Sequence, residues 1–350
     1  MVSSTEFDEP WPARYEARRL IPPRTGGTVT ASHPLPTRCH MPSSLRDAFQ
    51  AVVERHGDAP AIVLPGQPAI GFAALGAGSG ALAGTLAQLR VAKGDRVALV
   101  CPNCPEFAVA YLGIINAGAV VVPCNLLLNL EETAFILADA GAVGLIVHPQ
   151  FADTGKQLMR SVASLRFSIS TGEAEGSALA WADATAGGSG TSALPGLTRE
   201  DNAAIIYTSG TTGRPKGAML THGNLLANTH SVHQAMHWRS GEDVVLVVLP
   251  MFHAFAATVG MLTPLTGGCA LVPVPKFDPD QVARTLDVTG ATIFLGVPSM
   301  FSMFLKLKED RVPLFRSLRF CVSGGAALPV EVLTRFETKF GKPIYEGDGP

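Results

Sequence analysis

The sequence predicts an α/β protein whose mostly parallel sheets carry helices on their faces. From about residue 42, short apolar runs alternate with amphipathic stretches along the chain. The apolar runs contain few polar residues, which is typical of strands that are covered on both sides. The chain has 350 residues. Because a single hydrophobic core usually stops growing at about 250–300 residues, we expect two subdomains.

The expected strands are runs rich in Val, Ile, Leu and Ala, and the expected helices lie between them. We predict strands at 61–64, 96–101, 119–122, 144–147, 203–208, 244–249, 270–273, 292–295 and 318–322. Apolar residues three or four positions apart predict helices at 45–56, 73–89, 107–116, 131–140, 224–237, 279–288, 299–306 and 329–340. Ser43 and Ser44 precede the first helix, where a hydroxyl can accept hydrogen bonds from free backbone N–H groups.

The composition changes twice along the chain and divides it into three parts. Residues 1–40 are rich in Pro, Arg and Thr without periodicity, which predicts a flexible arm. Residues 41–196 are expected to form a first α/β subdomain, and residues 197–350 a second one. The first ends in a segment at 171–196, which is mostly Gly, Ala, Ser and Thr with a few acids. Such a segment buries little apolar area, so we interpret it as a surface linker.

Charge and hydropathy exclude several classes of protein. Charged residues make up 16% of the chain, against about 25% in an average protein, and the net charge is −2. Without a basic excess, nucleic-acid binding is disfavoured. The first 20 residues lack the apolar core of a signal peptide, so we expect a cytoplasmic protein. Stretches 107–130 and 244–275 carry no charge, but Gly, Pro and polar residues interrupt them, so we predict buried helix–strand units rather than membrane spans. Peripheral membrane contact and the oligomeric state stay open.

Two groups of potential metal ligands or redox residues stand out. Cys101 and Cys104 are the two neighbouring cysteines among six. We favour a buried structural role, because a redox or zinc role would require a helix start or a second pair. His230, His233 and His237 are spaced to share one helical face. No carboxylate joins them, so we favour a solvated or partly packed face over a metal site.

The segment at 203–217 (AAIIYTSGTTGRPKG) predicts a site for a polyphosphate. A buried strand runs into six consecutive hydroxyl or glycine residues: Thr208, Ser209, Gly210, Thr211, Thr212 and Gly213. Glycines let backbone N–H groups converge on an anion, and the hydroxyls add donors. Lys216 supplies a positive charge suited to outer phosphates. The segment is not a Walker A loop, because Gly217 rather than Ser or Thr follows the lysine.

This segment resembles the signature loop of adenylate-forming enzymes, the family of acyl-CoA synthetases, luciferases and peptide-synthetase adenylation domains. Further resemblances cover the chain from about residue 43. They are found at 112–126 (LGIINAGAVVVPCNL), 249–255 (LPMFHAF), 296–300 (GVPSM), 323–328 (SGGAAL) and 344–350 (IYEGDGP). The resemblance implies two stacked, mostly parallel sheets with helices on their faces, as in the family's N-terminal domain, here incomplete.

The resemblance also implies a reaction and its residues. In the family, a carboxylate reacts with ATP to give an acyl-adenylate, and the acyl group then passes to a thiol, usually that of coenzyme A. His253 and Lys216 are implied as catalytic residues, and Thr208 as a ligand of Mg²⁺. The implied nucleotide site comprises residues 208–213, Lys216, Gly324, Gly325, Ala326, Glu346, Gly347 and Asp348. The implied acyl site comprises Phe252, His253, Val297, Ser299 and Met300.

Two departures from the family pattern shape the expected function. Asp348 stands where relatives commonly have a tyrosine that packs on adenine. The sequence ends at Pro350, before the rest of that motif and before the C-terminal lid domain. We expect ATP-dependent activation of a fatty acid to acyl-CoA by the intact enzyme, and little or no adenylation by these residues alone.

Several alternatives stay open or are disfavoured. A non-catalytic relative that binds ATP or an acyl ligand, an acyl-AMP ligase that feeds a carrier protein and an aryl-acid ligase all stay open. A dinucleotide-binding oxidoreductase is disfavoured. The glycines at 76–81 fit its fingerprint, but Asp95 precedes a predicted strand instead of ending one. A serine hydrolase is disfavoured, because no Gly-x-Ser-x-Gly occurs.

Overall fold

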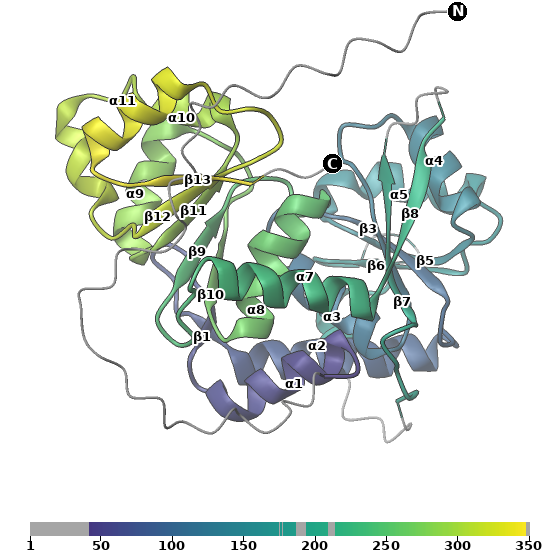
Figure 1. Ribbon diagram of the computed structural model, residues 1–350. Coiled ribbons are helices and arrows are strands. Elements are labelled where there is room, and N and C mark those ends of the chain that lie inside the picture. Colours follow the sequence, from purple (N-terminus) through teal and green to yellow (C-terminus); the bar gives the residue numbers. More distant parts are fainter. Residues whose placement is uncertain (1–41, 175, 177, 187–193, 209–213, 348–350) are drawn as a thin grey trace, which may run out of the picture. The chain divides into compact units, whose positions relative to one another are not determined.

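Two mostly parallel sheets form the framework of the computed structural model, which describes residues 42–174, 176, 178–186, 194–208 and 214–347 (Figure 1). The six-stranded sheet contains, in spatial order, β6 (Phe167–Ser170), β5 (Ala142–Val147), β3 (Arg96–Val100), β4 (Val120–Pro123), β7 (Asn202–Thr208) and β8 (Lys216–Thr221). The seven-stranded sheet contains, in spatial order, β13 (Ile344–Glu346), β12 (Phe320–Ser323), β11 (Ile293–Gly296), β9 (Val244–Val247), β10 (Ala270–Pro273), β1 (Pro60–Ile62) and β2 (Ile70–Gly71). Among these described strands, only the pairs β7–β8 and β1–β2 run antiparallel. The predicted α/β class is confirmed.

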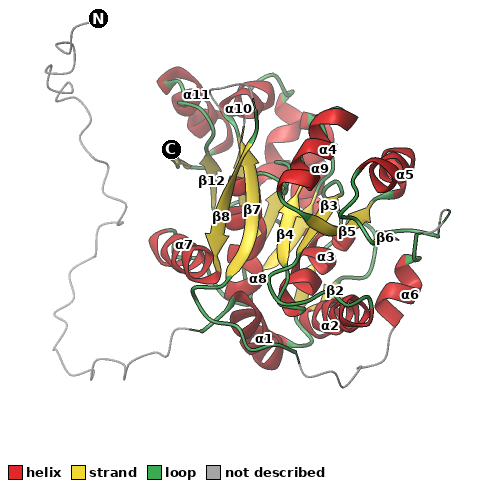
Figure 2. Cartoon of the chain, turned by 90° about the vertical axis from the view of Figure 1, so that its right-hand side faces the viewer, coloured by secondary structure: helices red, strands yellow, loops and turns green. Residues whose placement is uncertain are grey.

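Helices cover both faces of each sheet (Figure 2). The core between the sheets holds buried side chains of α1 (Leu45–His56), α2 (Phe72–Gln88), α3 (Pro105–Asn116), α7 (His222–Ala235) and α8 (Thr263–Gly267). A second core packs the outer face of the seven-stranded sheet against α9 (Pro279–Thr289), α10 (Pro298–Phe304) and α11 (Val330–Phe340). A third packs the outer face of the six-stranded sheet against α4 (Leu130–Asp139) and α5 (Ala152–Ser161).

Central strands such as β3 are apolar along most of their length because helices cover both faces of the sheets. On β3, Val97 and Leu99 belong to the central core, whereas Ala98 and Val100 belong to the outer core under α4 and α5. Successive residues of a strand point to opposite faces of the sheet, so a strand that is covered on both sides must be apolar throughout.

The boundary predicted at residue 196 does not separate the two sheets. The strands β1 and β2 precede it but belong to the seven-stranded sheet, whereas β7 and β8 follow it but belong to the six-stranded sheet. Contact within the chain likewise groups Pro42–Pro350 as one unit. The predicted arm at 1–40 lies outside the described residues.

The interpretation of 171–196 as a linker without internal order was wrong for the part that the structure describes. Within it, α6 (Trp181–Ala186) places the side chain of Ala184 in the core, fully buried. The Thr85 hydroxyl on α2 donates a hydrogen bond of 2.9 Å to the Ala184 carbonyl. One apolar anchor and one long-range hydrogen bond therefore order a helix that composition alone does not predict.

The two uncharged stretches fold as buried helix–strand units, as predicted. Residues 107–130 contribute α3 and β4, and residues 244–275 contribute β9, a π-helix (Ala256–Leu262), α8 and β10. No helix among the described residues combines the length and the hydropathy that a membrane span requires.

The expected histidine face on one helix is not formed. The helix α7 ends at Ala235, and His237 beyond it has a left-handed backbone with φ of 46°. His233 packs against Gly267, where an added Cβ would lie 2.6 Å from the imidazole Cδ2. In the part of the chain that the structure describes, no group of three or more His, Cys, Asp or Glu could hold a metal ion.

A buried histidine starts α7 next to the first helix of the fold. His222 is 1% exposed, and the Leu45 backbone N–H donates to its Nδ1 over 3.3 Å. Burial lowers the pKa of His222 to about 4, and the positive charge of Arg46 acts in the same direction against the opposing charge of Asp201. A protonated ring would also lose the Leu45 hydrogen bond and place a positive charge at the N-terminus of a helix.

This depressed pKa predicts a loss of stability in acid. Between pH 6.5 and pH 4 the unfolded chain binds a proton at His222 that the folded chain does not. The free energy of unfolding is therefore highest above pH 6.5 and decreases as the pH is lowered toward 4. At about 1.4 kcal/mol per pKa unit, the loss should be about 3 kcal/mol. Urea unfolding of the native protein and of the His222→Gln variant at both pH values measures the difference. Equal losses in the two proteins would contradict this role for His222.

Candidate functional site

Four of the predicted site segments meet at one edge of the seven-stranded sheet. The strands β9, β11, β12 and β13 run parallel, with Gly296 paired to Ser323 and Ser323 paired to Glu346. Their carboxyl ends therefore lie at the same edge, which is where open α/β sheets bind ligands. The segments that follow these four strands contain His253, Val297, Gly324 and Gly347, respectively.

Glycines after β12 let a phenylalanine from the β9 loop approach the backbone closely. A Cβ on Gly324 would lie 3.0 Å from a ring carbon of Phe255 and 3.3 Å from the Gly347 carbonyl oxygen. Gly325 has a left-handed backbone with φ of 79°, and a Cβ there would lie 3.5 Å from Val297 Cγ1. A side chain at 324 would therefore force Phe255 or the Gly347 backbone to shift by a few tenths of an ångström. Gly325 and Ala326 are exposed and leave a bare backbone surface beside Gly324.

The end of β13 holds this glycine segment in place. The Glu346 carboxylate accepts a 2.8 Å hydrogen bond from the Leu328 backbone N–H, and the Gly347 N–H donates over 2.8 Å to the Ser323 carbonyl. Within the described residues, Glu346 therefore anchors the 323–328 segment. Asp348, which we also predicted at the nucleotide, lies outside the described residues.

His253 lies in a turn that joins β9 to the π-helix. Its backbone N–H donates to the Pro250 carbonyl, and its own carbonyl accepts from Ala257. The imidazole is solvent-exposed on one side and packs on the other against the buried Phe252 ring, with ring centroids 4.8 Å apart. Partial burial lowers the pKa of His253 below its usual value, which favours a neutral ring near pH 7.

The predicted acyl-site residues after β11 lie at the start of α10. Val297 is the N-cap of this helix, and both Val297 and Met300 are half-buried against the central core. Ser299 is exposed. Because Val297 lies next to Gly325, the predicted acyl site and the 324–326 part of the predicted nucleotide site are neighbours.

The predicted phosphate loop belongs to the other sheet. Thr208 and Lys216 are paired at the loop end of the antiparallel β7–β8 hairpin, and both are exposed. Residues 209–213 between them lie outside the described residues. In the described part of the chain, no hydrogen bond or ion pair links Thr208 or Lys216 to the segments after β9, β11, β12 and β13.

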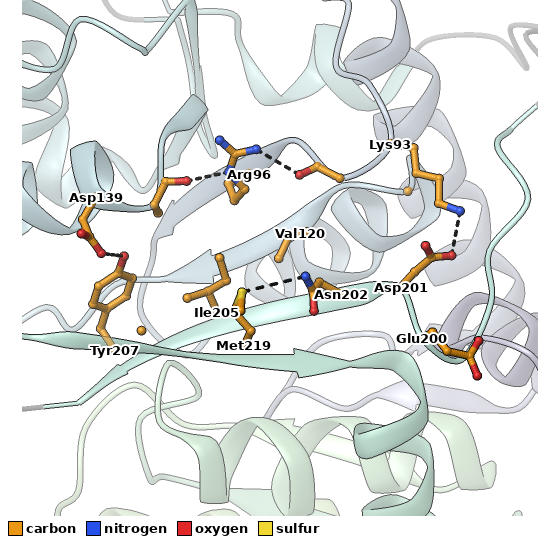
Figure 3. A pocket seen from close by; sticks show the side chains of 14 residues that line it. Lys93, Arg96, Val120, Asp139, Glu200, Asp201, Asn202, Ile205, Tyr207 and Met219 are labelled. Atoms are coloured by element: carbon orange, nitrogen blue, oxygen red, sulfur yellow. Dashed lines mark hydrogen bonds and ion pairs between the residues drawn. The ribbon is translucent and has the colours of Figure 1, made fainter.

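A pocket of about 650 Å³ opens on the six-stranded sheet, along that hairpin (Figure 3). Several of its polar and charged side chains have partners within the protein. Lys93 contacts Asp201 over 2.7 Å, Arg96 donates to the Ala140 carbonyl, and the Tyr207 hydroxyl donates to the Asp139 carboxylate over 2.6 Å. None of the predicted site residues lines this pocket.

Sequence analysis missed a residue that positions the His253 loop. Asn103, which is 6% exposed, lies just before α3, and its Nδ2 is 2.9 Å from the Leu249 carbonyl, 3.2 Å from that of Val247 and 3.1 Å from that of Val274. Its Oδ1 accepts a 2.8 Å hydrogen bond from the Met251 N–H. Asn103 therefore connects the β3–α3 turn of one sheet to the ends of β9 and β10 in the other. A single Pro-Asn dipeptide gives no sign of this role.

Curated relatives of the chain are ligases that act on carboxylic acids. It is 31% identical over 296 residues to the long-chain-fatty-acid–CoA ligase of Bacillus subtilis, covering 73% of this chain and 51% of that protein. It is 33% identical over 339 residues to the ligase of the same name from Escherichia coli O157:H7, covering 87% and 60%. A feruloyl-CoA synthase of Amycolatopsis is 34% identical over 284 residues, with coverage of 81% and 55%. The chain thus spans about half to three fifths of the length of these relatives.

Solved structures show the same fold. The N-terminal domain of FACL13 from Mycobacterium tuberculosis superposes with a TM-score of 0.77 at 27% identity, covering 88% of this chain and 75% of that one. ATP-bound MatB from Rhodopseudomonas palustris superposes with a TM-score of 0.75 at 29% identity, covering 87% and 59%. The profile of the family described as AMP-binding enzyme matches residues 49–350. Because this match includes every described segment of the candidate site, the chain belongs to the AMP-binding enzyme family.

Proposed function

We propose that this chain provides the ATP- and acid-binding part of an acyl-CoA ligase that activates a fatty acid to its acyl-adenylate and then to acyl-CoA. The observation that carries the proposal is the convergence of three segments. Phe255 packs on Gly324 and Val297 lies beside Gly325, so the segments after β9, β11 and β12 form one surface. The family match and the names of the relatives support the reaction class.

The described residues suit the charges of such a reaction. A carboxylate that attacks the α-phosphorus of ATP expels pyrophosphate, and the Lys216 ammonium would stabilise that leaving charge. His253 with a neutral ring would donate a hydrogen bond to the incoming carboxylate. The Thr208 hydroxyl is the kind of oxygen ligand that Mg²⁺ accepts, and the bound ion would neutralise phosphate charge. Gly325 and Ala326 offer the flat backbone surface on which a purine ring can lie.

An aliphatic acid is the substrate class that we favour. Val297 and Met300 are apolar and half-buried, and the flexible, unbranched Met300 side chain can adapt to a chain of methylene groups. An aryl acid is the second candidate, because the feruloyl-CoA synthase is as similar to this chain as the fatty-acid ligases are. Coenzyme A is the thiol acceptor that we favour, because the names of the relatives specify CoA, and a carrier protein is the alternative acceptor.

Binding measurements test both parts of the proposal. Calorimetry should detect MgATP binding, and Lys216→Ala should weaken it by about tenfold, since one charge-assisted contact to a phosphate is worth about 1.5 kcal/mol. Lys308→Ala, which removes another exposed lysine, should bind as the native chain does. An unreactive dodecyl ester of AMP should bind more tightly than a phenylpropyl ester. No detectable MgATP binding would refute the proposal, and tighter phenylpropyl binding would replace the fatty acid with an aryl acid.

A further inference from the structure

Two cysteines face each other at the junction between β3 and α3. Cys101 follows the last residue of β3 and is 1% exposed, whereas Cys104 is half-buried and is the N-cap residue of α3. Their sulfur atoms are 3.4 Å apart. The helix start that a redox role requires is therefore present, because α3 begins at Pro105, directly after Cys104.

The surroundings give the two thiols different roles. Cys104 makes no side-chain capping hydrogen bond, so its sulfur lies beside the positive end of the α3 dipole, which favours an anionic thiolate there. The contact with Cys104 and then burial raise the pKa of Cys101. Cys104, which solvent reaches, is thus the attacking thiol, and Cys101 behind it is the resolving thiol.

The other described cysteines do not share this arrangement. Cys124, Cys269 and Cys321 are each 1% exposed or less, and burial raises the pKa of each of their thiols. In the part of the chain that the structure describes, no other pair of sulfurs is in contact. Cys39 lies outside the described residues.

We propose that Cys101 and Cys104 form a reversible redox pair that exchanges with a small disulfide such as oxidised glutathione. The Cys104 thiolate attacks one sulfur of the disulfide, forms a mixed disulfide and releases one glutathione thiolate. Cys101 then loses its proton and attacks the Cys104 sulfur, which releases the second glutathione thiolate. The two protein thiols are oxidised, the small disulfide is reduced, and the two protons pass to the two released thiolates.

The pair is coupled to the His253 loop through Asn103, one of the two residues between its members. A disulfide bond is about 2.0 Å long, so the two sulfurs must approach by about 1.4 Å when it forms. Asn103 lies inside the closing ring, and its side chain makes the 2.8 Å hydrogen bond to Met251 and the 2.9 Å hydrogen bond to Leu249. Movement of this turn weakens these bonds, so oxidation loosens the segment that carries His253. This inference does not depend on the proposed substrate.

Mass spectrometry of the full chain tests the redox pair. After incubation with oxidised glutathione and alkylation in denaturant, the native chain should lack two alkyl groups relative to the reduced and alkylated chain, with the disulfide mapped to the Cys101–Cys104 peptide. Cys101→Ser should accumulate a glutathione adduct on Cys104, Cys104→Ser should accumulate none, and Cys321→Ser should behave as the native chain. Full alkylation of both cysteines in the native chain, or a disulfide that maps to Cys39, would overturn the proposal. Both outcomes are read from the native chain, so they do not depend on whether a variant folds.

Hydrogen exchange tests the coupling without any ATP or acid. The Met251 amide, in a peptide covering 249–255, should exchange faster in the oxidised chain and return to its original rate after reduction. The same rate in both states would overturn the coupling. Because neither readout uses nucleotide, a failure here is distinguishable from a failure of the proposed ligase function.

Discussion

Replacement of Asn103 by alanine should lower the free energy of unfolding by about 4 kcal/mol, because each buried polar group left without a partner costs about 1–3 kcal/mol. The variant removes the Asn103 donor to the carbonyls of Leu249 and Val274 and the acceptor of the Met251 N–H, whereas the Val247 carbonyl keeps its 2.8 Å hydrogen bond from the Val274 N–H. It also removes the side chain that links the two sheets at this point. Urea denaturation followed by circular dichroism measures the loss.

Asn125 offers a matched control for this substitution. Its side chain accepts one hydrogen bond, from the Leu127 N–H in an exposed turn, so Asn125→Ala should cost less than about 1 kcal/mol. If Asn103→Ala lowers stability by no more than this control, water replaces the amide and Asn103 does not hold the sheets together.

Local pattern was enough to predict the elements that are apolar and well bounded. The expected helix at 45–56 and the expected strand at 270–273 have the residue ranges of α1 and β10. Ser44 caps α1, as the sequence indicated, and accepts from the Asp47 N–H. Such features depend on neighbours in the sequence, so a single sequence contains them.

Edge strands and pairings between distant segments could not be predicted in this way. The strand β8 is exposed along most of its length and forms because β7 offers it backbone partners, so its residues show no buried pattern. The strand β1 pairs with β10, about 200 residues later, and nothing within either segment specifies that partner. For the same reason, the predicted boundary at residue 196 cut across both sheets.

The candidate site shows the same division. The sequence contains the residue types expected at a nucleotide site, which are Gly, Ser, Thr and Lys. The glycine segment after β12 could be expected near the segments that follow its neighbouring parallel strands, because the carboxyl ends of parallel strands lie at one edge of a sheet. The packing of Phe255 on Gly324 could not be inferred from the sequence, and neither could the hydrogen bond between Asn103 and the Met251 N–H. Each contact joins segments that are far apart in the sequence.

Gly324→Val should weaken MgATP binding by about a hundredfold and lower stability by about 2 kcal/mol, the usual cost of overpacking. A valine there places its Cβ 3.0 Å from the Phe255 ring and 3.3 Å from the Gly347 carbonyl, so Phe255 must shift and the backbone surface at Gly325 shifts with it. Calorimetry gives the affinity, and thermal melting reports whether the variant is folded.

Gly80→Val separates a general effect of adding a branched side chain from an effect at the site. Gly80 lies on α2, and a Cβ there has nothing within 4 Å, so this variant should keep both its stability and its affinity for MgATP. The informative comparison is a Gly324→Val protein that melts as a folded chain. If that protein binds MgATP as tightly as Gly80→Val does, the surface after β12 does not contact the nucleotide, and the adenine must be bound elsewhere at the carboxyl edge of the sheet.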